Sequence, residues 1–103
     1  MQAVVQWDKQ DNTLSLKGVL DHATVVQVYA EGEAWLNTAP KPAVIDLSQV
    51  QQSNSAGLAL LLQWLRVAQK NQIALTFKAV PLQMTRLMTV HGLQDLFSAY
   101  QTP

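Results

Sequence analysis

Cysteine is absent from this 103-residue chain. Its absence excludes disulfides and thiolate metal sites, and it fits a cytoplasmic protein. No stretch approaches the ~18 consecutive apolar residues that a membrane span needs. The opening residues, MQAVVQWDKQ, have neither the basic region nor the apolar region of a secretory signal. We therefore expect a cytoplasmic protein without a signal peptide and without direct insertion into a membrane.

An excess of charge of one sign is also missing, because seven acidic residues balance seven basic ones. This balance argues against a nucleic-acid partner held by phosphate contacts. The charges are nevertheless unevenly spread: residues 1–46 hold six acids and three bases, and residues 47–103 hold one acid and four bases. Two interpretations remain open, namely chance scatter on a solvated surface or a weakly basic face that meets an acidic partner.

The residues that usually carry catalysis or bind metals are sparse. His22 and His91 are the only histidines, and the four glycines are isolated from one another. No Ser–His–acid arrangement, glycine-rich phosphate loop or metal cluster follows from these spacings. Asp46, at the end of a predicted buried strand, is expected to accept amide hydrogens from the next residues rather than to hold a ligand. We therefore predict no catalytic residue, no metal and no cofactor.

Hydrophobic periodicity and turn residues predict eight elements in a single domain spanning residues 1–103. The predicted strands are residues 3–7, 13–17, 43–47 and 74–78, and the predicted helices are residues 22–37, 55–71, 82–91 and 93–100. Gly18 is expected to end the second strand, Gly92 to stop a helix, and Gly32 to let its helix approach the sheet closely. The order ββαβαβαα predicts an α/β fold with a small mixed sheet of about four strands and helices mainly on one side.

The predicted helix at residues 55–71 follows a polar loop at residues 48–54 and has two apolar stripes. The wider stripe belongs to the core and consists of Leu58, Leu61, Leu62, Leu65 and Ala68. The second stripe, Leu60, Trp64 and Val67, lies nearly opposite. Either a neighbouring helix covers this second stripe or a partner protein does, in which case Trp64 would be a plausible hot spot.

The start of this helix carries small and polar residues. Asn54 is placed to cap it, and Ser55 lies in the first turn, where a phosphate would be stabilised by unpaired amides and the helix dipole. Ala56 and Gly57 would let another protein's backbone approach closely. The alternative is that Ser53, Asn54 and Ser55 are ordinary capping residues.

Three motifs together resemble the STAS domain family (sulfate transporter and anti-sigma-factor antagonist). They are Asp46-Leu47-Ser48 at the end of a strand, Asn54-Ser55-Ala56-Gly57-Leu58 at a helix start, and Gly92-Leu93 later. The resemblance spans nearly the whole chain, and the stretch GLALLL and the single-domain length are most similar to a small STAS subunit of a phospholipid-moving ABC transporter. The resemblance implies that Ser55 occupies the family's phosphorylatable position.

The resemblance further implies a module that has no active site and binds the ATPase subunit of an ABC transporter. Through the ATPase, the module would be connected indirectly to the membrane permease. The transporter would move phospholipids and so maintain outer-membrane lipid asymmetry. Such a module would be cytoplasmic and peripheral at the inner membrane. The expected partner-binding residues are Ser53, Asn54, Ser55, Ala56, Gly57, Leu60 and Trp64. The alternative is an anti-sigma-factor antagonist switched by phosphorylation of Ser55. Asn54 replaces the family's usual Asp, which disfavours that switch and leaves docking unaffected.

Overall fold

The computed structural model describes residues 4–8, 12–38 and 42–100, with residues 4–8 described by their backbone alone. The elements follow in the order β1 (Val4–Asp8), β2 (Thr13–Leu20), α1 (His22–Thr38), β3 (Ala43–Ser53), α2 (Ser55–Lys70), β4 (Leu75–Lys78), α3 (Leu82–Val90) and α4 (Gln94–Ser98). Residue 3, the first of the predicted strand at residues 3–7, lies outside what the structure describes. The predicted α/β order ββαβαβαα is confirmed.

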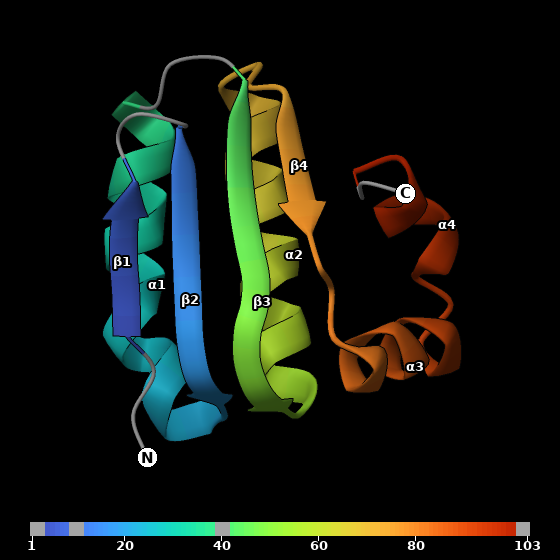
Figure 1. The fold of residues 1–103 in the computed structure, drawn as a ribbon. Coiled ribbons are helices and arrows are strands. Elements are labelled where there is room, and N and C mark those ends of the chain that lie inside the picture. The colour runs from blue at the N-terminus through green and yellow to red at the C-terminus, as the bar shows by residue number, and fades with distance from the viewer. Residues whose placement is uncertain (1–3, 9–11, 39–41, 101–103) are drawn as a thin grey trace.

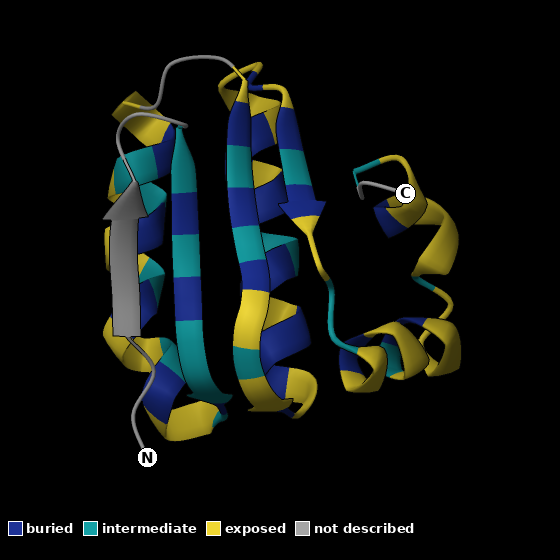
Figure 2. Cartoon of the chain, viewed as in Figure 1, coloured by how far each residue is buried: buried dark blue, intermediate teal, exposed yellow. Residues whose placement is uncertain are grey.

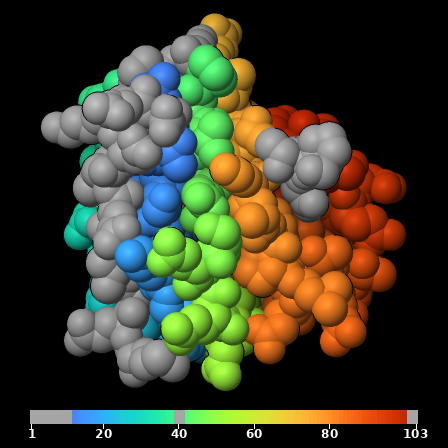
Figure 3. Space-filling model, in the orientation of Figure 1, coloured from blue at the N-terminus to red at the C-terminus, as the bar shows by residue number. Residues whose placement is uncertain are grey.

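The strands form one four-stranded sheet in the order β1-β2-β3-β4. β1 pairs with β2 in antiparallel fashion, and β2, β3 and β4 run parallel to one another. α1 and α2 both lie behind the sheet in Figure 1, while α3 and α4 flank it beyond β4. Figure 3 shows the opposite face of the sheet, where side chains of β2, β3 and β4 are in view with no described helix over them. The predicted mixed sheet with helices mainly on one side is therefore confirmed.

Two strands are longer than the sequence pattern predicts. The structure corrects the polar loop at residues 48–54, because β3 continues as a strand through Ser53. It also corrects the role of Gly18, which does not end β2. Gly18 has a φ of 96° and lies at a register irregularity between β2 and β3, after which Val19 pairs with Gln52 and Leu20 with Ser53. The exposed polar end of β3 is yellow in Figure 2.

The apolar core lies between the sheet and the two helices α1 and α2. Leu14 and Leu16 of β2 and Ile45 and Leu47 of β3 point into it and are buried. Leu58, Leu61 and Leu65 from the wide stripe of α2 are buried against them, as the periodicity predicts. Burial on this scale supplies most of the free energy that stabilises a domain of this size.

The second stripe of α2 is covered by α1. Leu60, Trp64 and Val67 are all buried, and the indole nitrogen of Trp64 donates a hydrogen bond to the Tyr29 carbonyl oxygen at 3.2 Å. Gly32 makes this contact possible, because a Cβ atom there would overlap Cζ2 and Cε2 of the Trp64 ring. Gly32 therefore approaches α2 and not the sheet, which corrects the sequence expectation.

The C-terminal helices complete the core beside β4. Met84 and Met88 of α3 are buried, and Phe97 of α4 packs against Phe77 of β4 with 5.8 Å between ring centroids. The Phe77 amide donates to the Tyr100 carbonyl oxygen at 2.6 Å. The predicted stop at Gly92 is confirmed: α3 ends at Val90, Gly92 has a φ of 69°, and the Leu93 amide donates back to the Met88 carbonyl.

Candidate functional site

Ser55 lies at the end of the sheet where the parallel strands β2 and β3 finish and α1 and α2 begin (Figure 1). Its neighbour Asn54 is the N-cap of α2: the Oδ1 atom of Asn54 accepts the Ala56 amide at 2.8 Å, which confirms the predicted cap. The Asn54 amide donates to the Leu20 carbonyl at 3.1 Å. Ser55 is thereby held on the first turn of α2 with its side chain exposed.

Ser53 supports this turn from beneath. It is nearly buried, its hydroxyl donates to the Asn54 carbonyl at 3.1 Å, and its amide donates to Oε1 of Gln83 at 3.0 Å. The bond to Gln83 ties α3 to the end of β3. Ser53 therefore braces the start of α2 from inside the fold, and its predicted contact with a partner stays a prediction.

The small residues at the start of α2 also serve internal packing. Gly57 is buried, and a Cβ atom there would overlap the Ser53 hydroxyl and approach Cβ of Leu20 at 3.0 Å. Ala56 is buried as well. The prediction that Gly57 admits a partner's backbone is therefore wrong, because the space beside it is filled by β2 and β3.

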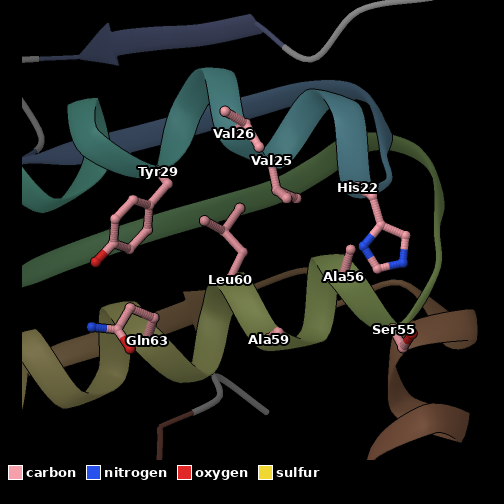
Figure 4. Close-up of a pocket in the computed structure, with 9 residues that line it drawn as sticks. All are labelled: His22, Val25, Val26, Tyr29, Ser55, Ala56, Ala59, Leu60 and Gln63. Carbon is pink, nitrogen blue, oxygen red and sulfur yellow. The ribbon is translucent and has the colours of Figure 1, made fainter.

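An apolar groove of about 510 Å³ runs between α1 and α2 and ends near Ser55. We name it the α1–α2 groove; it is lined by His22, Val25, Val26, Tyr29, Ser55, Ala56, Ala59, Leu60 and Gln63. Figure 4 shows Val25 and Leu60 pointing toward each other between the helices, Tyr29 directed toward Gln63, and His22 close to the start of α2. Val26, on its rim, is 75% exposed. The groove therefore offers apolar surface to another molecule.

The electrostatics of the α1–α2 groove are nearly neutral. None of its nine lining residues is an acid, a lysine or an arginine. At one end, a hydrogen bond to Glu33, together with burial and the negative charge of Glu33, raises the pKa of Tyr29 against a smaller opposing effect of a hydrogen bond with Gln63.

A second groove of about 470 Å³ lies on the other side of Ser55, between the start of α2 and α3. We name it the α2–α3 groove; it is lined by Ser53, Asn54, Ser55, Gln83, Arg86, Leu87 and Val90. Ser55 lines both grooves and so stands on the ridge between them. This arrangement suits binding of a protein surface along the first turn of α2.

The structure separates the predicted partner-binding residues into two groups. Asn54 and Ser55 are exposed at the ridge, whereas Ser53, Ala56, Gly57, Leu60 and Trp64 are buried. The prediction that Trp64 contacts a partner is wrong, because this side chain is fully buried against α1. Leu60 and Ala56 are also buried, but they line the α1–α2 groove. Asp46 behaves as expected toward its neighbours, accepting the Ser48 amide at 2.9 Å.

The contributions of α1 and α3 to the two grooves were not predicted from the sequence. Val26, Tyr29, Arg86 and Val90 lie far from Ser55 in the sequence and are brought to it by the fold. Val26 and Val90 carried a usable signal, since each is an apolar residue outside the buried stripe of its helix.

Within residues 4–8, 12–38 and 42–100, no helix is long and apolar enough to cross a membrane. Within the same ranges no group of three or more His, Asp or Glu side chains is placed to hold a metal ion.

Comparison with known proteins gives a consistent result. Residues 3–98 match the family model described as "Mlab, STAS domain". The chain is 30% identical over 99 residues to the intermembrane phospholipid transport system binding protein MlaB of Haemophilus influenzae, covering 89% of this chain and 94% of that protein.

Solved structures agree with this match. A chain of the Acinetobacter MlaFEDB complex, in an ATP-bound conformation, superposes with a TM-score of 0.72 at 32% identity, covering 89% of this chain and 95% of that chain. The anti-sigma factor antagonist SpoIIAA, in its unphosphorylated form, has a TM-score of 0.68 at 15% identity, covering 97% of this chain and 85% of that chain. The second likeness shows a shared fold alone, whereas the first also shares sequence. The chain belongs to the MlaB family of STAS domains.

Proposed function

We propose that this chain is the MlaB-type subunit of an ABC transporter that moves phospholipids and maintains outer-membrane lipid asymmetry. In this role it binds an MlaF-like ATPase subunit directly and contacts the membrane permease only through it. The proposal is supported by the relatives, which are named for intermembrane phospholipid transport and for the MlaFEDB complex. The chain has no catalytic role of its own, and it supports the assembly and activity of the ATPase.

The observation that carries the proposal is the exposed ridge at Ser55 with the apolar α1–α2 groove beside it. Val26 is 75% exposed and lies on the rim of this groove, so the two together form a continuous exposed apolar surface. Such a surface is typical of a site that another protein covers. In the assembled transporter this subunit lies at the cytoplasmic face of the inner membrane, held there by the ATPase.

Binding to the purified ATPase subunit of the same transporter tests the proposal. Ala59 is exposed and lines the α1–α2 groove, so Ala59→Arg places a long charged side chain in the groove without disturbing the core. We expect Ala59→Arg to raise the Kd at least about tenfold, the effect of losing roughly 1.4 kcal/mol of binding energy.

Ala34→Arg is the matched control, because Ala34 is an exposed alanine of α1 that does not line the groove. It should bind as the unmodified chain does. If both variants bound normally, the ATPase would not dock on this groove; if the unmodified chain did not bind at all, the proposed function would be wrong.

The alternative of an anti-sigma-factor antagonist is tested separately. Ser55 is exposed enough to be phosphorylated, and the likeness to SpoIIAA supplies the fold but no function at 15% identity. Mass spectrometry of the protein purified from its own cells decides: phosphoserine at position 55 with a bound kinase would favour the alternative.

A further inference from the structure

We propose that the α2–α3 groove receives an acidic side chain that the partner carries on an otherwise apolar segment. The inference rests on the proposed function, since the partner in question is the ATPase subunit. It adds a second contact, with different chemistry, on the far side of Ser55 from the α1–α2 groove.

The first observation is that α3 has one face in the core and another face at the groove. Met84 and Met88 are buried in the core, whereas Gln83, Arg86, Leu87 and Val90 follow the i, i+3, i+4, i+7 spacing of a single stripe and line the groove. Leu87 is half-buried and Val90 is 77% exposed. This stripe is apolar enough to bind a partner and is not covered by any other described element.

The second observation is the state of Arg86. Its side chain is exposed at the groove, and among the described residues the guanidinium has neither an ion pair nor a hydrogen bond. A guanidinium beside apolar side chains binds a carboxylate well, because the planar group can donate two parallel hydrogen bonds. Arg86 therefore specifies the charge of the segment that fits here.

The third observation is the charge pattern of the helices. α2 and α3 contain basic residues, Arg66, Lys70 and Arg86, and no acid, whereas α1 contains Glu31 and Glu33 and no lysine or arginine. Among the residues that line the α2–α3 groove, Arg86 alone is charged, and the start of α2 adds the positive end of its dipole. A negatively charged segment is the complementary occupant.

Arg86→Glu tests the inference in a binding titration against the purified ATPase subunit. Because Arg86 has no described partner inside the chain, the substitution should leave the unfolding midpoint unchanged. We expect the Kd to rise by more than about tenfold, since an opposed charge pair replaces a favourable one. Arg86→Gln should give a smaller rise and a weaker dependence of Kd on salt concentration.

Arg66→Glu is the matched control, since Arg66 is an exposed arginine of α2 outside the groove. It should change the Kd less than about threefold, the level of a rim charge. An equal rise in Kd for Arg86→Glu and Arg66→Glu would mean that the basic residues attract the partner only through their general charge. That result would overturn the inference of a specific site at Arg86. Normal binding by Arg86→Glu, with Ala59→Arg still impaired, would overturn the inference and leave the proposed function standing.

A chemical test identifies the occupant directly. Arg86→Lys places a primary amine in the groove, and a zero-length carbodiimide would join that amine to an adjacent carboxylate as an amide. Mass spectrometry should find the link to an aspartate or glutamate of the ATPase, absent from the same experiment with Arg66→Lys. A link to α1 of a second copy of this chain would instead show that the groove serves self-association and would overturn the inference.

Discussion

At the scale of single residues, Gly32 of α1 lies directly against the Trp64 ring of α2. The sequence showed a glycine inside a helix and an apolar stripe without an assigned cover, but it could not show that the two meet. Periodicity reports which residues share a face and carries no information about which helix lies opposite. The choice between internal packing and a partner face for Trp64 was therefore decided by the fold alone.

Gly32→Ala should destabilise the protein, although alanine favours helix by about 1 kcal/mol over glycine. The new methyl group would meet the buried Trp64 ring, and overpacking of this kind costs about 1–3 kcal/mol. Urea unfolding measures the change. In a Trp64→Leu background the same substitution should be neutral or stabilising, and persistence of the loss there would contradict the assigned contact.

Asp21 should contribute stability that depends on pH. The pKa of its carboxyl group is lowered, mainly because the Thr24 amide donates a hydrogen bond to the carboxylate. Burial opposes this effect. The Ala23 amide, the Thr24 hydroxyl and the charge of His22 lower the pKa further. Since the folded pKa is below the unfolded one, this stability is present above the unfolded value and is lost as pH falls through the folded value.

Asp21→Asn keeps an oxygen acceptor but cannot ionise. We expect the unmodified protein to have the higher Tm near neutral pH, and the difference should shrink as pH falls below about 4. Thermal unfolding across this range checks the prediction. A difference that stayed constant with pH would show that the Asp21 charge is not involved.

At the scale of elements, the start of α2 depends on a local signal and so was predictable. Asn54 accepts the Ala56 amide, two residues away, and a cap of this kind needs no knowledge of the rest of the chain. The length of β3 was not predictable in this way. Its polar end, which resembles a loop in sequence, is held as a strand by pairing with β2 some 30 residues earlier, as in the Leu20–Ser53 pair. The positions of the motifs could thus be predicted from the sequence, but the strand pairing between β2 and β3 that holds them could not.

Asn54→Ala should destabilise the protein by about 1 kcal/mol, because the Ala56 amide loses its acceptor. Asn54→Asp should be equal to the original or slightly more stable, since a carboxylate accepts the same bond and favours the helix start. Chemical denaturation of the three proteins checks both expectations. Equal stability of the alanine variant would mean that water replaces the cap without loss.

At the scale of the whole molecule, α4 closes the end of the core beyond β4. Phe97 is fully buried, and it packs against Phe77. Phe97→Ala should cost about 3–5 kcal/mol, a large part of the 5–15 kcal/mol that stabilises a typical domain. Leu96→Ala is the matched control: Leu96 is the neighbouring residue and 38% exposed, so its loss should be small. Similar unfolding midpoints for the two variants would contradict the assigned packing.

The hydrogen bond from Phe77 to Tyr100 also bears on association between copies of the chain. β4 is the last strand in the sheet order, so one of its edges has no strand beside it. The Phe77 amide on β4 is instead bonded to the Tyr100 carbonyl. An open strand edge offers its backbone groups to a strand of another chain. Displacing the segment at Tyr100 would therefore turn the edge of β4 into a place where aggregation can begin.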